Sequence, residues 1–262
     1  MLTKEAFDTL HDKASKCKYT YAFDHLDYDE CQNAAVLSDN DDLIILINKI
    51  EVYWATNDPD MLLNALCSIP EKLYIEFIPP EYIEKFEQAG FYVYAEFVDF
   101  FNNNLRETQT GFTDYHAIEF ANKDDIDTIR AMTTMSVDQT RGFRYETEQW
   151  YLDFLTDNDI IILQKDGVLI GYCCVSVYAN GTILWVRRIA VHPDYQGKGY
   201  GGQLMERAFT YGIHKGAHRA FLHADIQNTS GIRLYNRYGF AAQSERGEII
   251  MIREENPPST ST

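Results

Sequence analysis

The chain of 262 residues lacks the features that would mark a membrane, secreted or nucleotide-hydrolysing protein. No apolar run approaches the ~20 residues of a membrane-spanning helix, and the N-terminus lacks the apolar core of a signal peptide. No P-loop motif, Gly-x-x-x-x-Gly-Lys-Ser/Thr, occurs. We therefore expect a cytoplasmic protein with no membrane partner.

Cysteines are few and are not spaced as metal ligands. The five cysteines form an odd set without a Cys-x-x-Cys pair or a Cys/His metal motif. Cys173 and Cys174 lie inside an apolar, strand-like run. The sequence predicts reduced thiols in the core and no bound metal.

Basic residues are scarce. Lys and Arg number 23 against 40 Asp and Glu, which gives a formal net charge of −17. The first 112 residues carry 21 acidic against 8 basic side chains, whereas residues 113–262 carry 19 against 15. An acidic excess opposes binding to a phosphate backbone, so nucleic acid is not an expected partner. The excess suits an amine substrate or a cationic partner, and it also serves general solubility.

One glycine-rich turn stands between a strand-like run, residues 182–191, and a helix-like run, residues 203–214. Its glycines are Gly197, Gly199, Gly201 and Gly202. Glycines let the backbone turn sharply, and a helix N-terminus directs N–H groups at an anion. The turn is a candidate pyrophosphate cradle, although a bare tight turn has the same composition.

Two motifs in order resemble a known family. Gln196-Gly-Lys-Gly199-Tyr-Gly201 resembles Gln/Arg-x-x-Gly-x-Gly/Ala, the acyl-CoA pyrophosphate loop of the GNAT superfamily of N-acyltransferases. Further on, Asn228-Thr-Ser-Gly-Ile-Arg-Leu-Tyr235-Asn-Arg-Tyr-Gly-Phe240 is similar to the family's Asn-x-x-Ala-x-x-Leu-Tyr-x-x-x-Gly-Phe element, with Gly231 in place of Ala. The resemblance covers roughly residues 113–255.

The resemblance implies an acetyl-CoA cosubstrate. The positions that it assigns to acetyl-CoA binding are Ile189, Val191, Gln196, Gly197, Lys198, Gly199, Tyr200, Gly201, Gly202 and Asn228. It also places Tyr235 as the general acid that protonates the leaving thiolate, in preference to Tyr238. Packing of Tyr235 between helix and sheet is the competing interpretation.

The general base departs from the family pattern. Relatives often carry a Glu at the position of Trp185 or at that of His223. Imidazole titrates near ~6.5, so His223 is the candidate base, with Asp225 on the same strand face as a possible assistant. A structural histidine, or water acting as base, are the alternatives.

Other residues are expected near the acceptor. Trp185 is expected to form a wall of the acceptor pocket. Arg141 and Arg144 are candidates to bind a substrate carboxylate, unless they are simply solvated. Arg187 and Arg188 should alternate between the faces of their strand, so that at least one points into a wet groove.

Element order predicts an α/β fold. Residues 113–262 are expected to form a GNAT-like domain with a mixed, mostly antiparallel sheet flanked by helices, which closes with strands at 241–243 and 248–253. Residues 115–120 should form its first strand. Residues 1–112 should form a smaller α/β domain that completes or covers the acceptor cleft.

An internal similarity concerns residues 72–101, where strand, helix, Gly90-Phe91 and strand follow one another as they do in residues 220–252. The first domain is therefore either a degenerate half-copy of the second or an unrelated α/β lid.

Together these features predict an N-acetyltransferase that transfers acetyl directly from acetyl-CoA to a primary amine of a small molecule. Protein N-termini or lysines are the alternative acceptors within the class. A non-catalytic acyl-CoA-binding regulatory module is the alternative outside it.

Overall fold

A computed structural model describes residues 1–24, 26, 28–108, 110–136, 141, 146–243 and 247–255. The chain divides into two compact units, Met1–Glu96 with Glu248–Thr262, and Phe97–Gly247. The sequence placed a single boundary between residues 112 and 113, and a separate domain at 113–262 stays a prediction. Helices in the described part of the chain are too short or too polar to cross a bilayer.

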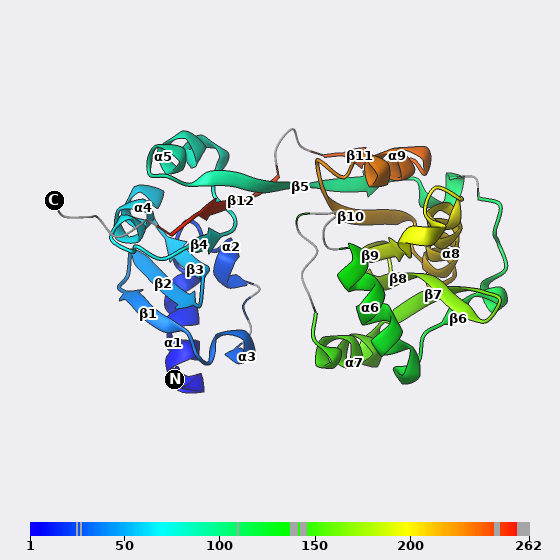
Figure 1. The fold of residues 1–262 in the computed structure, drawn as a ribbon, viewed down its shortest axis with the longest axis horizontal. Coiled ribbons are helices and arrows are strands. Elements are labelled where there is room, and N and C mark those ends of the chain that lie inside the picture. Colours follow the sequence, from blue (N-terminus) through cyan, green and yellow to red (C-terminus); the bar gives the residue numbers. More distant parts are fainter. Residues whose placement is uncertain are drawn as a thin grey trace. The chain divides into compact units, whose positions relative to one another are not determined.

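The first unit is a sheet with helices (Figure 1). Its strands lie in the order β1-β2-β3-β4-β12, with only the β3–β4 pair parallel. Its elements are α1 (Lys4–Ala14), α2 (Tyr21–Asp24), α3 (Tyr28–Cys31), β1 (Ala35–Asp39), β2 (Leu43–Asn48), β3 (Glu51–Thr56), α4 (Pro59–Cys67), β4 (Leu73–Ile75), α5 (Ile83–Gln88), the start of β5 (Tyr92–Asn102), and β12 (Glu248–Arg253).

The second unit has helices on both faces of its sheet (Figure 1). Its strands lie in the order β5-β10-β9-β8-β7-β6, and β11 pairs with the other edge of β5. Its elements are the end of β5, β6 (Glu119–Phe120), α6 (Ile126–Ser136), α7 (Glu148–Asp157), β7 (Asp159–Lys165), β8 (Val168–Tyr178), β9 (Ile183–Val191), α8 (Tyr200–His214), β10 (Arg219–Asp225), α9 (Thr229–Arg237) and β11 (Ala241–Ala242). The predicted mixed, mostly antiparallel sheet flanked by helices is confirmed.

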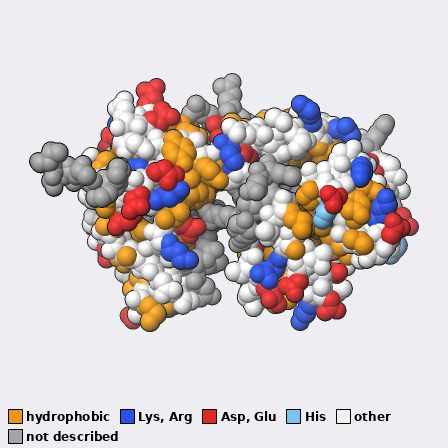
Figure 2. Space-filling view, in the orientation of Figure 1, with side chains coloured by type: hydrophobic (Ala, Val, Ile, Leu, Met, Phe, Trp, Pro, Cys, Tyr) orange, Lys and Arg blue, Asp and Glu red, His pale blue; other side chains and the backbone are white. Residues whose placement is uncertain are grey.

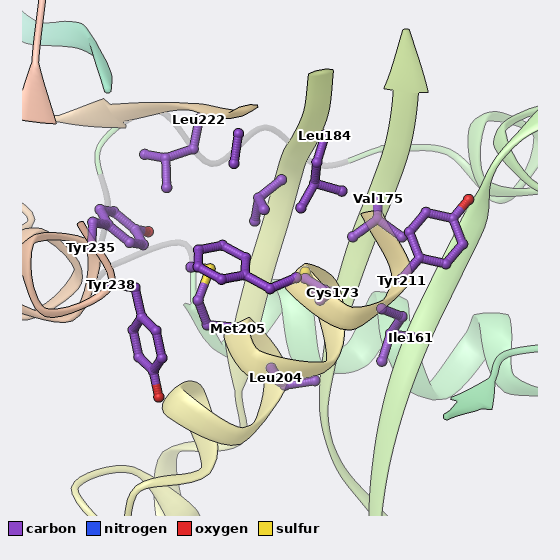
Figure 3. Packing of buried hydrophobic residues seen from close by; sticks show 14 of the residues in the cluster. Ile161, Cys173, Val175, Leu184, Leu204, Met205, Tyr211, Leu222, Tyr235 and Tyr238 are labelled. Atoms are coloured by element: carbon purple, nitrogen blue, oxygen red, sulfur yellow. The ribbon is translucent and has the colours of Figure 1, made fainter. Parts of the chain in front are cut away.

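Two hydrophobic cores fill the second unit because its central strands are buried on both faces. Side chains of α8 and α9 pack on one face of the sheet, and those of α6 and α7 on the other. Cys173 and Cys174 face opposite cores, and all five cysteines are free thiols. Figure 3 shows the first core, where Met205 of α8 and Tyr235 of α9 lie against the sheet strands. Acidic and basic side chains are interspersed on the visible surface of each unit (Figure 2).

The two units share one strand topology. In each, two antiparallel pairings are followed by a parallel one and then by an antiparallel one, along β1-β2-β3-β4-β12 and along β7-β8-β9-β10-β5. The turns after α5 and α9 also agree, because Gly90 and Gly239 have φ of 87° and 76°. The Phe91 N–H donates to the Phe86 carbonyl at 3.0 Å, and Phe240 donates to Tyr235 at 3.1 Å. These likenesses support the half-copy, which stays a prediction.

Two predicted strands differ in the structure. Residues 248–253 form the expected strand, but it pairs with β4 in the first unit, where Ile252 lies opposite Tyr74. Residues 115–117 are a 3-10 turn, because the Asp114 carboxylate accepts a hydrogen bond from the His116 N–H. Only Glu119–Phe120 pairs with β7.

Candidate active site

A cleft opens in the second unit where two parallel strands part. The ladder between β9 and β10 runs from Ile183 and Arg219 to Trp185 and Phe221. Beyond these residues both strands continue, to Val191 and Asp225, and they line a cleft of about 540 Å³ together with the glycine-rich turn and α9. A space between two strands that are still held together at one end admits an extended ligand along their backbones.

The glycine-rich turn closes one end of the cleft. Gly197 and Gly199 have φ of 72° and 88°, in the left-handed region that favours glycine, and a Cβ added at either would meet nothing within 4 Å. Helix α8 begins at Tyr200 with Gly199 as its N-cap, so no side chain caps its first turn. The first N–H groups of a helix have no intrahelical acceptor, and they carry its positive dipole end. The turn can therefore hold an anion.

Seven of the ten positions that the sequence assigned to acetyl-CoA line the cleft: Ile189, Val191, Gln196, Gly197, Tyr200, Gly201 and Asn228. The other three are Lys198, Gly199 and Gly202. Lys198 Nζ donates a hydrogen bond to the Asp194 carbonyl at 2.8 Å, within the same turn. A Cβ on Gly202 would lie 3.0 Å from the Tyr238 hydroxyl, so this glycine gives room for helix packing. The roles of all ten residues in cofactor binding stay predictions.

Asn228 caps the helix that carries the tyrosine. Its Oδ1 accepts a hydrogen bond from the Gly231 N–H at 2.9 Å. A Cβ on Gly231 would lie 2.5 Å from Asn228 Nδ2. The departure from Ala at position 231 therefore gives space to the capping side chain.

Tyr235 lies at the wall of the cleft. Its ring packs against Phe100 and Phe240, and the residue is 7% exposed. Burial raises the pKa of the phenol well above its ordinary value, so the hydroxyl stays protonated. No described residue is hydrogen-bonded to this hydroxyl. Tyr238 differs, because its hydroxyl donates to the Glu206 carboxylate at 2.9 Å and joins α9 to α8.

His223 lines the cleft and is held by a residue that the sequence did not single out. In the antiparallel ladder of β5 and β10 it lies opposite Asp99, and its Nδ1 is 2.8 Å from Asp99 Oδ1. The imidazole also stacks on Phe97 at 5.2 Å between ring centroids. The prediction that Asp225 assists His223 is wrong, because Arg141 donates hydrogen bonds to both carboxylate oxygens of Asp225, at 2.8 and 3.0 Å.

A β-bulge rearranges the middle of β9. Cys174 lies opposite Arg188 and Val175 opposite Val186, so Arg187 is an extra residue without a partner in the ladder. The bulge turns both arginines to one side, where their guanidinium carbons lie 5.7 and 5.1 Å from the ring centre of Trp150. The predicted alternation of Arg187 and Arg188 is therefore wrong.

Comparison with known proteins identifies the family to which this part of the chain is similar. Residues 123–240 match the family described as the acetyltransferase (GNAT) family. This stretch of the chain is a GNAT acetyltransferase domain. Like the predicted resemblance, the match lies in the C-terminal half, and it contains the cleft strands, the glycine-rich turn and all of α9.

Individual relatives are similar over limited stretches. The chain is 27% identical to a mycothiol acetyltransferase of Acidimicrobium ferrooxidans over 40% of its length and 34% of the relative's. It is 37% identical to a streptothricin acetyltransferase of Streptomyces lavendulae over 31% of its length and 43% of the relative's. The chain thus spans well under half the length of these relatives. A GCN5-related N-acetyltransferase structure from Sphaerobacter thermophilus shares the fold, with a TM-score of 0.59 and 14% identity over 82% of this chain and 76% of that one.

The rest of the cleft lining combines predicted and unforeseen residues. Trp185 lines the cleft, and its role beside the acceptor stays a prediction. Arg141 is bound to buried Asp225, and Arg144 lies outside the described residues. Glu146 and Trp150 also line the cleft, and Glu146 forms an ion pair with Arg188. Among the described residues, no group of His, Cys, Asp and Glu is placed to hold a metal ion.

Proposed function

We propose that the protein transfers an acetyl group from acetyl-CoA to a primary amine of a small molecule, directly and without a covalent enzyme intermediate. The observation that carries this proposal is that one cleft contains both a helix start without a side-chain cap and a buried phenol whose hydroxyl has no hydrogen-bond partner among the described residues. The names of the two curated relatives, which refer to mycothiol and to streptothricin, support a small-molecule acceptor.

Different residues of the cleft would bind different parts of acetyl-CoA. The N–H groups at the start of α8 would bind the pyrophosphate, since glycines let the backbone approach it. Ile189 and Val191, beyond the point where β9 leaves β10, offer backbone groups to the pantetheine arm. Bound here, acetyl-CoA supplies an activated acyl group, and the parted strands supply hydrogen bonds and exclude water.

Transfer requires the ammonium group of the acceptor to lose two protons and the departing sulfur to gain one. An amine with pKa near ~10 is mostly protonated at neutral pH, so His223 would take a proton before the nitrogen attacks. Asp99 at Nδ1 favours the tautomer in which Nε2 carries the lone pair that accepts a proton. The C–N bond forms, the C–S bond breaks, and Tyr235 donates its proton to the departing sulfur. The nitrogen loses its second proton as it becomes an amide, and a proton returns to Tyr235.

Amine-dependent release of CoA thiol tests the function. The protein is incubated with acetyl-CoA and a panel of primary amines, and free thiol and acetylated amine are measured together. Equal amounts of both products are expected with at least one amine. Tight binding of acetyl-CoA without amine-dependent thiol release would contradict the proposal and indicate a non-catalytic module.

We expect His223→Ala to lower kcat/KM by on the order of 10²-fold and to remove the acidic limb of its pH profile, because the proton acceptor is gone. Asp99→Asn should lower kcat/KM less and keep that limb, because the imidazole remains but its tautomer is no longer fixed. Initial rates across pH with a good acceptor measure both effects.

His218→Ala is the matched control, because His218 is exposed and does not line the cleft. It should leave the profile unchanged. Circular dichroism verifies that each variant is folded. An acidic limb that persists in folded His223→Ala would show that another group deprotonates the amine.

A further inference from the structure

We propose that the acceptor carries a carboxylate beside its amine, as an amino acid does, and that Arg187 binds this carboxylate. The inference rests on the proposed acetyl transfer and names the substrate class for the same cleft.

The first argument comes from the charges that line the cleft. Glu146 is paired with Arg188, and Asp225 with Arg141. His223, which is neutral when it acts as the base, is hydrogen-bonded to Asp99. Arg187 is the remaining charged residue of the described lining, and no acidic partner within ion-pair distance is described for it. Among the described lining residues, Arg187 is therefore the charged group that can pair with an anionic group of the acceptor.

The second argument concerns how Arg187 is held. Its guanidinium carbon lies 4.5 Å from the ring centre of Trp185 and 5.7 Å from that of Trp150. Indole rings hold a guanidinium by cation–π contact and leave its N–H groups free. A planar, oriented guanidinium binds a carboxylate through two parallel hydrogen bonds. The indole N–H of Trp185 is buried and also has no acceptor among the described residues.

The third argument is the place of Arg187 along the strand. It stands four residues before Val191, about 13 Å from the end of β9 that meets the glycine-rich turn, at ~3.3 Å per residue. Arg187 is thus too far along β9 to share the anion bound by that turn. The cleft has two anion-binding positions, of which the turn suits the donor and Arg187 suits the acceptor.

This arrangement disfavours a polyamine. A second ammonium group of the acceptor would meet the unpaired guanidinium, and like charges repel in a partly desolvated cleft. An amino acid presents an amine to the base and a carboxylate to Arg187, which satisfies both. The guanidinium in the cleft therefore favours an acceptor with a carboxylate, whereas the net negative charge of the whole chain by itself would favour a cationic one.

Pairs of acceptors that differ only in the carboxylate test the inference. Phenylalanine is compared with phenethylamine, and methionine with 3-(methylthio)propylamine, in the acetylation assay. We expect kcat/KM for the amino acid of at least one pair to exceed that of its decarboxylated partner by tenfold or more. Calorimetric titration of each compound into CoA-saturated protein gives the same comparison without turnover.

Arg187→Gln should remove the preference by raising KM for the amino acid roughly tenfold to a hundredfold, while KM for acetyl-CoA and the rate with the decarboxylated amine change little. Arg187→Lys should keep part of the preference, because lysine keeps the charge but cannot form the two parallel hydrogen bonds of a guanidinium. Lys165→Gln, which removes an exposed charge at the end of β7, is the matched control and should leave the preference intact.

The outcomes separate the two proposals. Equal acetylation of both members of every pair, or a preference that survives in folded Arg187→Gln, would overturn the carboxylate inference and leave acetyl transfer standing. Binding of amino acids without any acetylation would support the inference about the acceptor site and contradict the proposed function.

Discussion

Tyr235→Phe is expected to lower kcat by ~10²-fold to 10⁴-fold with little change in the affinity for acetyl-CoA. The substitution keeps the ring that packs on Phe100 and Phe240 and removes only the hydroxyl. A proton donor used in the transition state affects kcat and kcat/KM alike, whereas binding of the donor is retained. Steady-state kinetics with a good acceptor, together with calorimetric titration of CoA, measure the two quantities.

Tyr238→Phe is the matched control in the same helix. Its hydroxyl bonds to Glu206 and to the Gly202 carbonyl, so its loss should cost about 1 kcal/mol of unfolding free energy and leave kcat near the wild-type value. Wild-type turnover in Tyr235→Phe would show that water or another group protonates the thiolate.

The pH profile gives a further check on Tyr235. Because burial raises the pKa of its phenol above the ordinary value of ~10, the hydroxyl is protonated at every lower pH and loses its proton only above that range. Tyr235 should therefore cause no basic limb in kcat below about pH 10. A basic limb near neutrality that disappears in Tyr235→Phe would contradict this assignment.

Gly199→Val is expected to weaken CoA binding in a protein that still folds. The new side chain would stand in the open space at the start of α8, where the pyrophosphate is proposed to approach the backbone. Loss of charge-assisted hydrogen bonds of about 1.5–3 kcal/mol corresponds to roughly tenfold to a hundredfold in Kd. Calorimetric titration with CoA measures the change.

Gly167→Val separates this effect from backbone strain. Gly167 has φ of 76°, an added Cβ there also meets nothing within 4 Å, and it lies in the turn between β7 and β8. Both substitutions should lower the unfolding free energy by about 1–3 kcal/mol, because a β-branched residue is strained at positive φ. Only Gly199→Val should change the Kd of CoA. An unchanged Kd in Gly199→Val would contradict the pyrophosphate assignment.

The sequence alone was sufficient for features that depend on neighbouring residues. The strand-like run 182–191 and the helix-like run 203–214 agree with β9 and α8 to within a few residues, because each element buries a face set by its own repeat. The glycine-rich turn was recognisable for a similar reason, since a positive φ, as at Gly197 and Gly199, favours glycine. The spacing from Asn228 to Phe240 favoured Tyr235 over Tyr238, and of these two Tyr235 is the one that lines the cleft.

Tertiary structure decided which distant residues meet. Asp99 reaches His223 only through the register of β5 and β10, and strand register depends on the whole sheet and not on a local motif. The bulge at Arg187 depends on how β8 pairs with β9, and it reverses the face that a period of two predicts for the next residues. The pairing of β12 with β4 could likewise not be predicted, because the sequence of a strand specifies its buried faces but not the strand beside which it lies. The amino-acid sequence thus determined the glycine-rich turn and the helix that carries Tyr235, whereas the contact of His223 with Asp99 and the bulge at Arg187 arise from how the strands pair.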